Sequence, residues 1–159
     1  MLDRICVAYD EGAPSRAALS VAVQLAGRAG AALTLVHVAD PQIDQPVTGE
    51  DRVGFDLLGF TDERRWQARL TAVAAQAGDR LAPEGGGEVE VRTVAGEPAD
   101  ELPELASATG ADLIVAGAPR CGLRAVLTRS VSRALTRGAT RPVLFAPGEA
   151  VRADGAVLV

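Results

Sequence analysis

The feature that most limits what this chain can fold into is the alternation of short apolar runs with longer segments of helical periodicity. The apolar runs predict five strands, at residues 5–9, 33–38, 89–94, 113–116 and 142–146. The segments between them predict helices over residues 14–27, about 62–81 and 100–109, and a last helix that ends near residue 137. Strands that alternate with helices favour a mostly parallel sheet with helices on both faces. The sequence therefore predicts an α/β fold.

Two of the predicted helices carry further signals. The helix over residues 62–81 follows a cap at Thr61 or Asp62, and its buried stripe consists of Trp66, Leu70, Val73, Ala77 and Leu81. The helix over residues 100–109 contains Pro103, which is tolerated in a first turn because the N–H groups there have no helical partner. The long polar segment from residue 39 to about residue 60 predicts either a functional loop or partial disorder.

Composition narrows the class of protein. Hydrophobic residues make up 48% of the 159 residues, but aromatic residues only 3%, so the core must consist of Val, Leu, Ile and Ala, as in a buried parallel sheet. A net charge of −5 argues against general nucleic-acid affinity. The sequence predicts neither a membrane-spanning stretch nor a signal peptide. We therefore expect a cytoplasmic protein with no nucleic-acid and no membrane partner.

One connection has the pattern of an anion-binding site. The fourth apolar run ends at Gly117, a loop with Gly122 follows, and the next helix opens with Ser130 and Ser132. The first N–H groups of a helix lack helical partners, and the helix dipole favours negative charge beside them. Ligands of parallel sheets bind beyond the carboxyl ends of the strands, where the strand order reverses, so Asp10 and Gly117 are the natural candidates. This pattern predicts a site for a phosphate-bearing ligand.

The order of the elements, together with several local strings, resembles the universal stress protein family. The strings that carry the resemblance are residues 7–10, 15–19, 35–38, 96–99, 111–117, 122–124, 130–134 and 141–144. The resemblance covers residues 1–147 and implies one domain with an adenine nucleotide α hydrolase-like fold, an open five-stranded parallel sheet in the order 3-2-1-4-5. It also implies a stress-response role without catalysis, and a homodimer formed through the edge of the fifth strand.

The same resemblance implies where a nucleotide would bind. ATP-binding members carry a loop of the form Gly, two residues, Gly, nine residues, Gly-Ser/Thr, whereas other members have lost the loop and bind no nucleotide. Gly117 matches the first glycine and Ser130 the final hydroxyl, with an interval one residue short. Arg120 stands near the second glycine position, Arg129 replaces the glycine before the serine, and Glu11 stands where ATP-binding members usually have glycine. Glycine lets backbone approach phosphate closely, whereas arginine instead donates hydrogen bonds to it, so this loop is degenerate.

The predicted cofactor-binding set follows from this match. It consists of Asp10, Val38, Gly117, Arg120, Gly122, Arg129, Ser130, Val131 and Ser132. The cofactor would be ATP, with Mg²⁺ only if ATP binds. Plain structural explanations stay open beside this one: Asp10 as a carboxylate at a helix N-terminus, Gly117 as a tight exit from a strand, and Ser130 and Ser132 as helix caps. The sequence shows no catalytic residues and no metal-ligand set.

Other polar residues favour structural explanations. His37 lies in an apolar strand and is expected to be a satisfied core residue rather than a base or a ligand. Cys6 and Cys121 have neither disulfide nor metal-site spacing. Residues 117–147 contain six arginines and no acidic residue, which indicates either a solvated helix face or an anion site.

These observations leave three functional hypotheses. The leading one is a non-enzymatic, stress-response regulatory domain whose degenerate ATP-type site still binds nucleotide. The alternatives are a nucleotide-free dimeric scaffold for protein interactions and a slow ATP hydrolase. Residues 148–159 form a tail outside the domain, which either adds a strand to a neighbouring sheet edge or begins a second copy of the domain.

Overall fold

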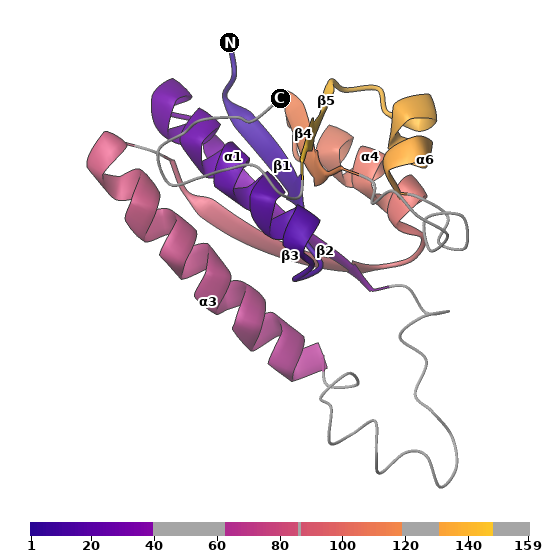
Figure 1. Cartoon of the computed structure of the whole chain (residues 1–159), viewed down its shortest axis with the longest axis horizontal. Coiled ribbons are helices and arrows are strands. Elements are labelled where there is room, and N and C mark those ends of the chain that lie inside the picture. The colour runs from indigo at the N-terminus through magenta and orange to yellow at the C-terminus, as the bar shows by residue number, and fades with distance from the viewer. Residues whose placement is uncertain (40–62, 86, 119–130, 148–159) are drawn as a thin grey trace, which may run out of the picture.

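The computed structural model describes residues 1–39, 63–85, 87–118 and 131–147. Within them the strands are β1 (Arg4–Ala8), β2 (Ala32–Ala39), β3 (Val89–Ala95), β4 (Leu113–Gly117) and β5 (Val143–Ala146). The helices are α1 (Ala13–Ala29), α3 (Glu63–Leu81), α4 (Pro98–Ala108) and α6 (Val131–Gly138), with a 3₁₀ turn, η1 (Ala82–Glu84). All strand pairs are parallel, and the sheet order is β3-β2-β1-β4-β5 (Figure 1). The predicted class and strand order are confirmed.

The sheet separates two apolar cores. Alternate residues of a strand point to opposite faces, so Ile5 and Val7 of β1 face one core while Cys6 faces the other. Helices α1 and α3 cover the first face (Figure 1), and α4 and α6 cover the second. The predicted stripe of α3 is confirmed: Leu70, Ala77 and Leu81 are buried in the first core, and Trp66 and Val73 pack against it.

The structure corrects one helix position. Helix α4 begins at Pro98, and the N–H groups of Asp100 and Glu101 both donate to the Glu97 carbonyl at 3.0 Å. The first-turn placement predicted for Pro103 is therefore wrong, because the helix starts two residues earlier and Pro103 lies inside it. Pro98 takes the first-turn position instead, where its fixed φ suits a helix start and its missing N–H costs nothing.

Some predictions fall outside the described residues. These are the segment from residue 40 to residue 60, the caps at Thr61 and Asp62, Cys121, and the tail over residues 148–159.

The amino edge of the sheet is tied together by Asp112, which precedes β4. Its Oδ2 accepts hydrogen bonds from the N–H groups of Asp3, at 2.9 Å, and Arg4, at 3.0 Å. These two bonds, of which the one from Asp3 has the larger effect, lower the pKa of the partly exposed Asp112 carboxyl. The aspartate in the 111–117 string thus joins the starts of β1 and β4.

At the carboxyl edge, β4 and α1 approach each other closely at Gly117. A Cβ on Gly117 would lie 2.5 Å from Cβ and 2.6 Å from the carbonyl carbon of Pro14, in the first turn of α1. The chain does not turn away at this point, because the N–H of Ala118 still donates to the Ala146 carbonyl of β5 at 2.7 Å. The contact with Pro14 therefore gives Gly117 a role in packing α1 against β4. The chain beyond residue 118, on which the predicted tight exit depends, lies outside the described residues.

The Asp112 contact predicts a pH dependence of stability. The folded state lowers the pKa of this carboxyl below its ordinary value of 3.8, so ionisation stabilises the fold above that pH. The contribution is lost as the pH falls through the lowered folded value. We expect Asp112→Asn to reduce the free energy of unfolding at pH 7, and the difference from wild type to shrink below pH 3.8.

Urea unfolding over a pH series measures this difference. Asp79→Asn, at an exposed carboxylate in the last turns of α3, serves as the matched control and should show a smaller change. A difference between Asp112→Asn and wild type that does not vary with pH would contradict the prediction.

The Gly117 contact predicts that a single methyl group destabilises the fold. Gly117→Ala should lower the free energy of unfolding by about 1–3 kcal/mol, because α1 must move away from β4. Gly78→Ala is the matched control, since a Cβ at Gly78 in α3 meets nothing within 4 Å, and it should stabilise by about 0.5–1 kcal/mol through helix propensity. Denaturant midpoints of the two variants measure both effects, and equal midpoints would refute the packing argument.

Candidate functional site

The sheet has a topological switch point between β1 and β4. These strands are neighbours, with Val7 opposite Val115, yet α1 after β1 lies on the first face and α6 after β4 lies on the second. Ligands of open α/β sheets bind at such a point, outside the carboxyl ends of the strands. Asp10 follows β1, Gly117 ends β4 and Val38 lies near the end of β2. The structure thus brings these three predicted site residues to one edge of the sheet.

Of the other predicted site residues, the structure describes only two. Arg120, Gly122, Arg129 and Ser130 lie outside the described residues, while Val131 and Ser132 form the beginning of α6. The part of the site that the structure describes is therefore the edge formed by β1, β2 and β4.

Asp10 organises the turn from β1 into α1. Its Oδ1 accepts a hydrogen bond from the N–H of Gly12, the N-cap of α1, at 2.8 Å. Ser15 closes the same turn, because its Oγ accepts from the Asp10 N–H at 3.3 Å and donates to the Gly12 carbonyl at 3.0 Å. The Asp10 side chain is nevertheless exposed. It is therefore both a carboxylate at a helix N-terminus and a group that a ligand can reach.

Glu11 occupies a backbone conformation that favours glycine. Its φ is 62°, in the left-handed region, which costs a non-glycine residue about 1–2 kcal/mol. Its Oε1 lies 3.2 Å from Nε of Arg69 on α3, and its carbonyl accepts a hydrogen bond from Nη1 of Arg16. The sequence predicts the chemical departure from glycine at this position. The conformational demand and the ion pair appear only in the structure.

Val38 presents backbone groups to this edge. Hydrogen bonds of a parallel strand alternate between its two neighbours. In β2 the carbonyl of Val36 accepts from Tyr9 at 2.8 Å, on the β1 side, and the carbonyl of Ala39 accepts from Gly96 at 3.0 Å, on the β3 side. The N–H and C=O of Val38 therefore point to the β1 side, beyond the end of β1 at Ala8.

His37 is a satisfied core residue, as the sequence predicts. Its side chain is buried, and Nδ1 lies 3.1 Å from the Tyr9 carbonyl oxygen. The imidazole stacks on the indole of Trp66 in α3, with ring centroids 4.1 Å apart and planes inclined by 15°. The ring is therefore held on two sides.

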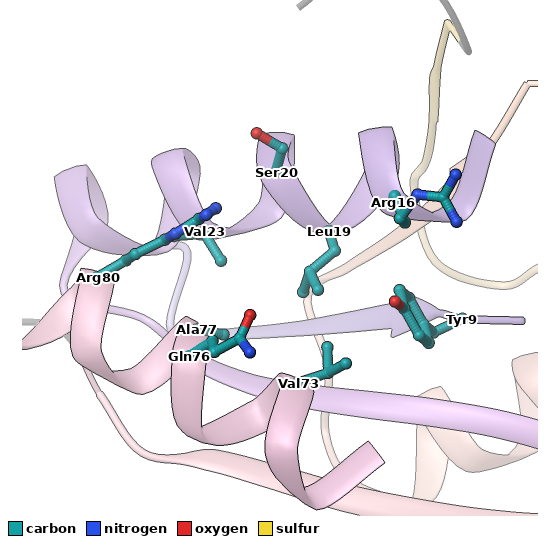
Figure 2. Close-up of a pocket in the computed structure, with 9 residues that line it drawn as sticks. All are labelled: Tyr9, Arg16, Leu19, Ser20, Val23, Val73, Gln76, Ala77 and Arg80. Carbon is teal, nitrogen blue, oxygen red and sulfur yellow. The ribbon is translucent and has the colours of Figure 1, made fainter. Parts of the chain in front are cut away.

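A groove between α1 and α3 opens beside this edge (Figure 2). Its volume is about 240 Å³, and it is lined by Tyr9, Arg16, Leu19, Ser20, Val23, Val73, Gln76, Ala77 and Arg80. Leu19 and Val73 point toward each other across it, and Arg16 and Arg80 stand toward opposite ends (Figure 2). Burial raises the pKa of Tyr9, and the Glu11 carboxylate raises it further, so the phenol remains a neutral donor. The sequence signals only the helical spacing of α1 and α3, so it does not predict the groove.

Further observations concern a reactive thiol, a metal site and a membrane-spanning helix. The Cys6 thiol is buried, and burial raises its pKa to about 12, so it is no nucleophile at neutral pH. Among the described residues there is no group of three His, Cys, Asp or Glu side chains placed to hold a metal ion. None of the helices described in the structure combines the length and apolar character needed to traverse a lipid bilayer.

Comparison with known proteins agrees with this fold. The sequence matches the universal stress protein family over residues 1–147. It is 31% identical to universal stress protein YxiE of Bacillus subtilis (strain 168), covering 91% of this chain and 99% of that protein. A solved structure from the universal stress protein family of Burkholderia pseudomallei is 30% identical, with a TM-score of 0.63 over 92% of this chain and 96% of that one.

A second solved structure is that of a universal stress protein in complex with cAMP. It is 25% identical, with a TM-score of 0.64, and covers 92% of this chain and 98% of that one. The match over residues 1–147 and the sheet order β3-β2-β1-β4-β5 lead to one conclusion: this chain belongs to the universal stress protein family.

Proposed function

We propose that this chain is a non-enzymatic stress-response regulator that binds an adenine nucleotide at the carboxyl ends of β1, β2 and β4. The observation that carries the proposal is the convergence of Asp10, Val38 and Gly117 at the switch point of the sheet. The family member solved in complex with cAMP supports an adenine nucleotide as the class of ligand.

The backbone of Val38 suits the base of such a ligand. One residue of a strand offers an N–H donor and a C=O acceptor on the same side, and adenine has an acceptor nitrogen beside its exocyclic amino donor. The exposed carboxylate of Asp10 is an acceptor suited to ribose hydroxyls. In this proposal Val38 selects the base and Asp10 holds the sugar.

The phosphate side of the site is where the chain departs from ATP-binding relatives. Glu11 places a negative charge next to Asp10, offset in part by its ion pair with Arg69. Arg120 stands near one loop glycine position of ATP-binding members and Arg129 replaces another, and both would supply guanidinium donors to phosphate. We therefore propose weak binding of ATP, with Mg²⁺ carried by the phosphates rather than held by a protein site.

A second part of the proposal concerns assembly. Strand β5 is at an edge of the sheet, and Leu144 in its middle is 37% exposed, one of two large hydrophobic side chains exposed among the described residues. An unpaired edge with an apolar side chain favours association with a second chain. We propose a homodimer through β5, which would also form in a nucleotide-free scaffold.

The nucleotide proposal predicts that a change of Asp10 lowers the affinity for ATP. Asp10→Asn keeps the oxygen that accepts from Gly12 but removes the charge. We expect its affinity for ATP to fall by about tenfold or more, because hydrogen bonds to charged groups are the stronger ones. Isothermal titration calorimetry with ATP and Mg²⁺ measures the affinities, and assay of released phosphate in the same samples tests the hydrolase alternative.

Asp79→Asn, on the exposed surface of α3, is the control and should bind as wild type does. Wild-type protein that shows no saturable heat at millimolar ATP would leave the nucleotide-free scaffold as the function. Phosphate release that is lost in Asp10→Asn would favour the hydrolase instead.

The assembly proposal predicts that Leu144→Arg dissociates the dimer. Light scattering should give twice the chain mass of 16.3 kDa for wild type and the single-chain mass for the variant. Gln24→Arg, at an exposed position of α1, adds the same charge away from β5 and should leave the mass unchanged. A monomeric wild type, or a dimeric Leu144→Arg, would exclude this interface.

A further inference from the structure

The hydrogen-bond ladder between β1 and β2 ends at Tyr9, one link short of Val38. The Tyr9 N–H donates to the Val36 carbonyl at 2.8 Å. In a regular parallel pair the next link runs from the N–H of Val38 to the carbonyl of Tyr9. That carbonyl oxygen instead lies 3.1 Å from Nδ1 of His37. A carbonyl only accepts, so Nδ1 is the donor.

The His37 ring is held in a position from which Nδ1 can donate a hydrogen bond to the Tyr9 carbonyl. It is 7% exposed, and it stacks on Trp66 of α3 at a centroid distance of 4.1 Å. Because Trp66 packs against the core on the α1 and α3 face, the Tyr9 carbonyl is directed toward that face and out of the plane of the sheet. The contact therefore ends the β1–β2 ladder as well as satisfying a buried imidazole.

Because the ladder ends there, the backbone N–H of Val38 is left without a partner in β1. Within the part of the chain that the structure describes, the hydrogen bonds assign no backbone partner on the β1 side to its N–H. Its side chain packs in the second core, so the residue itself is fixed while its backbone edge stays open.

We infer that His37 is a positioning residue for nucleotide binding, which holds the Tyr9 carbonyl away from Val38 and so keeps the Val38 backbone open for the base. The inference rests on the proposed function for the identity of the ligand. The open backbone edge of Val38 does not depend on the proposed function, because it is a property of the free protein.

The first experiment measures amide hydrogen exchange of Val38 by NMR in the free protein. His37→Phe keeps an aromatic ring against Trp66 but has no donor, so the Tyr9 carbonyl should return to the ladder and pair with Val38. We expect exchange of the Val38 amide to slow by tenfold or more in His37→Phe. His37→Asn, whose amide nitrogen takes the place of Nδ1, should exchange as wild type does. Equal rates in all three proteins would overturn the inference.

The second experiment separates base from phosphate recognition. Calorimetry with ATP and with inorganic tripolyphosphate is carried out on the same three proteins. His37→Phe should lose about tenfold in affinity for ATP, the value of roughly one hydrogen bond, and keep its affinity for tripolyphosphate. His37→Asn should bind both ligands within about threefold of wild type.

The outcomes distinguish this inference from the proposed function. Equal losses for ATP and tripolyphosphate in His37→Phe would show a general structural role and overturn the inference, as would an unchanged affinity for ATP. Wild-type protein that binds no ATP would refute the proposed function, and the exchange rates of Val38 would then decide alone whether His37 keeps that edge open.

Discussion

The organisation of this molecule depends on one constraint: β1 lies in the middle of the sheet and must leave it within a few residues. It is hydrogen-bonded to β2 on one side and β4 on the other, and the buried polar groups of a backbone need partners wherever a ladder stops. Three side chains supply them at the exit: Asp10 for Gly12, Ser15 for the Asp10 N–H, and His37 for the Tyr9 carbonyl. The candidate site is thus built from the groups that terminate the central strand.

This arrangement explains how a binding edge is held by a core with few aromatic residues. The two cores consist largely of Ala, Val, Leu and Ile on either side of the sheet, and alanines on α1 let the helix lie close to the strands. Close approach leaves little space at the carboxyl edge, as the Gly117–Pro14 contact shows. Backbone groups at that edge are therefore fixed in position before any ligand arrives, which lowers the entropic cost of binding.

The fold could be predicted largely from the sequence because its signals are local. Alternation of apolar runs with helical spacing gives the class, and the family resemblance gives the strand order. The sequence does not define the start of α4, because Pro98 and Pro103 are both compatible with a first turn and only the hydrogen bonds to Glu97 decide between them. Of the candidate site, the place of Asp10 follows from its position at a strand end, whereas Val38 follows only from the family resemblance. The Glu11–Arg69 ion pair and the groove between α1 and α3 join elements distant in sequence, so no local pattern reports them.

The reason for the glycine at the end of β4 has a consequence for how such proteins are classified. If the neighbouring helix requires that residue, selection for a stable fold will retain it in descendants that no longer bind any ligand. A signature search that scores this glycine as evidence for a nucleotide pocket would then count bare scaffolds as binders. The turn after the first strand carries separate information, because its conformation favours glycine and a side chain there, as at Glu11, changes the charge beside any ligand.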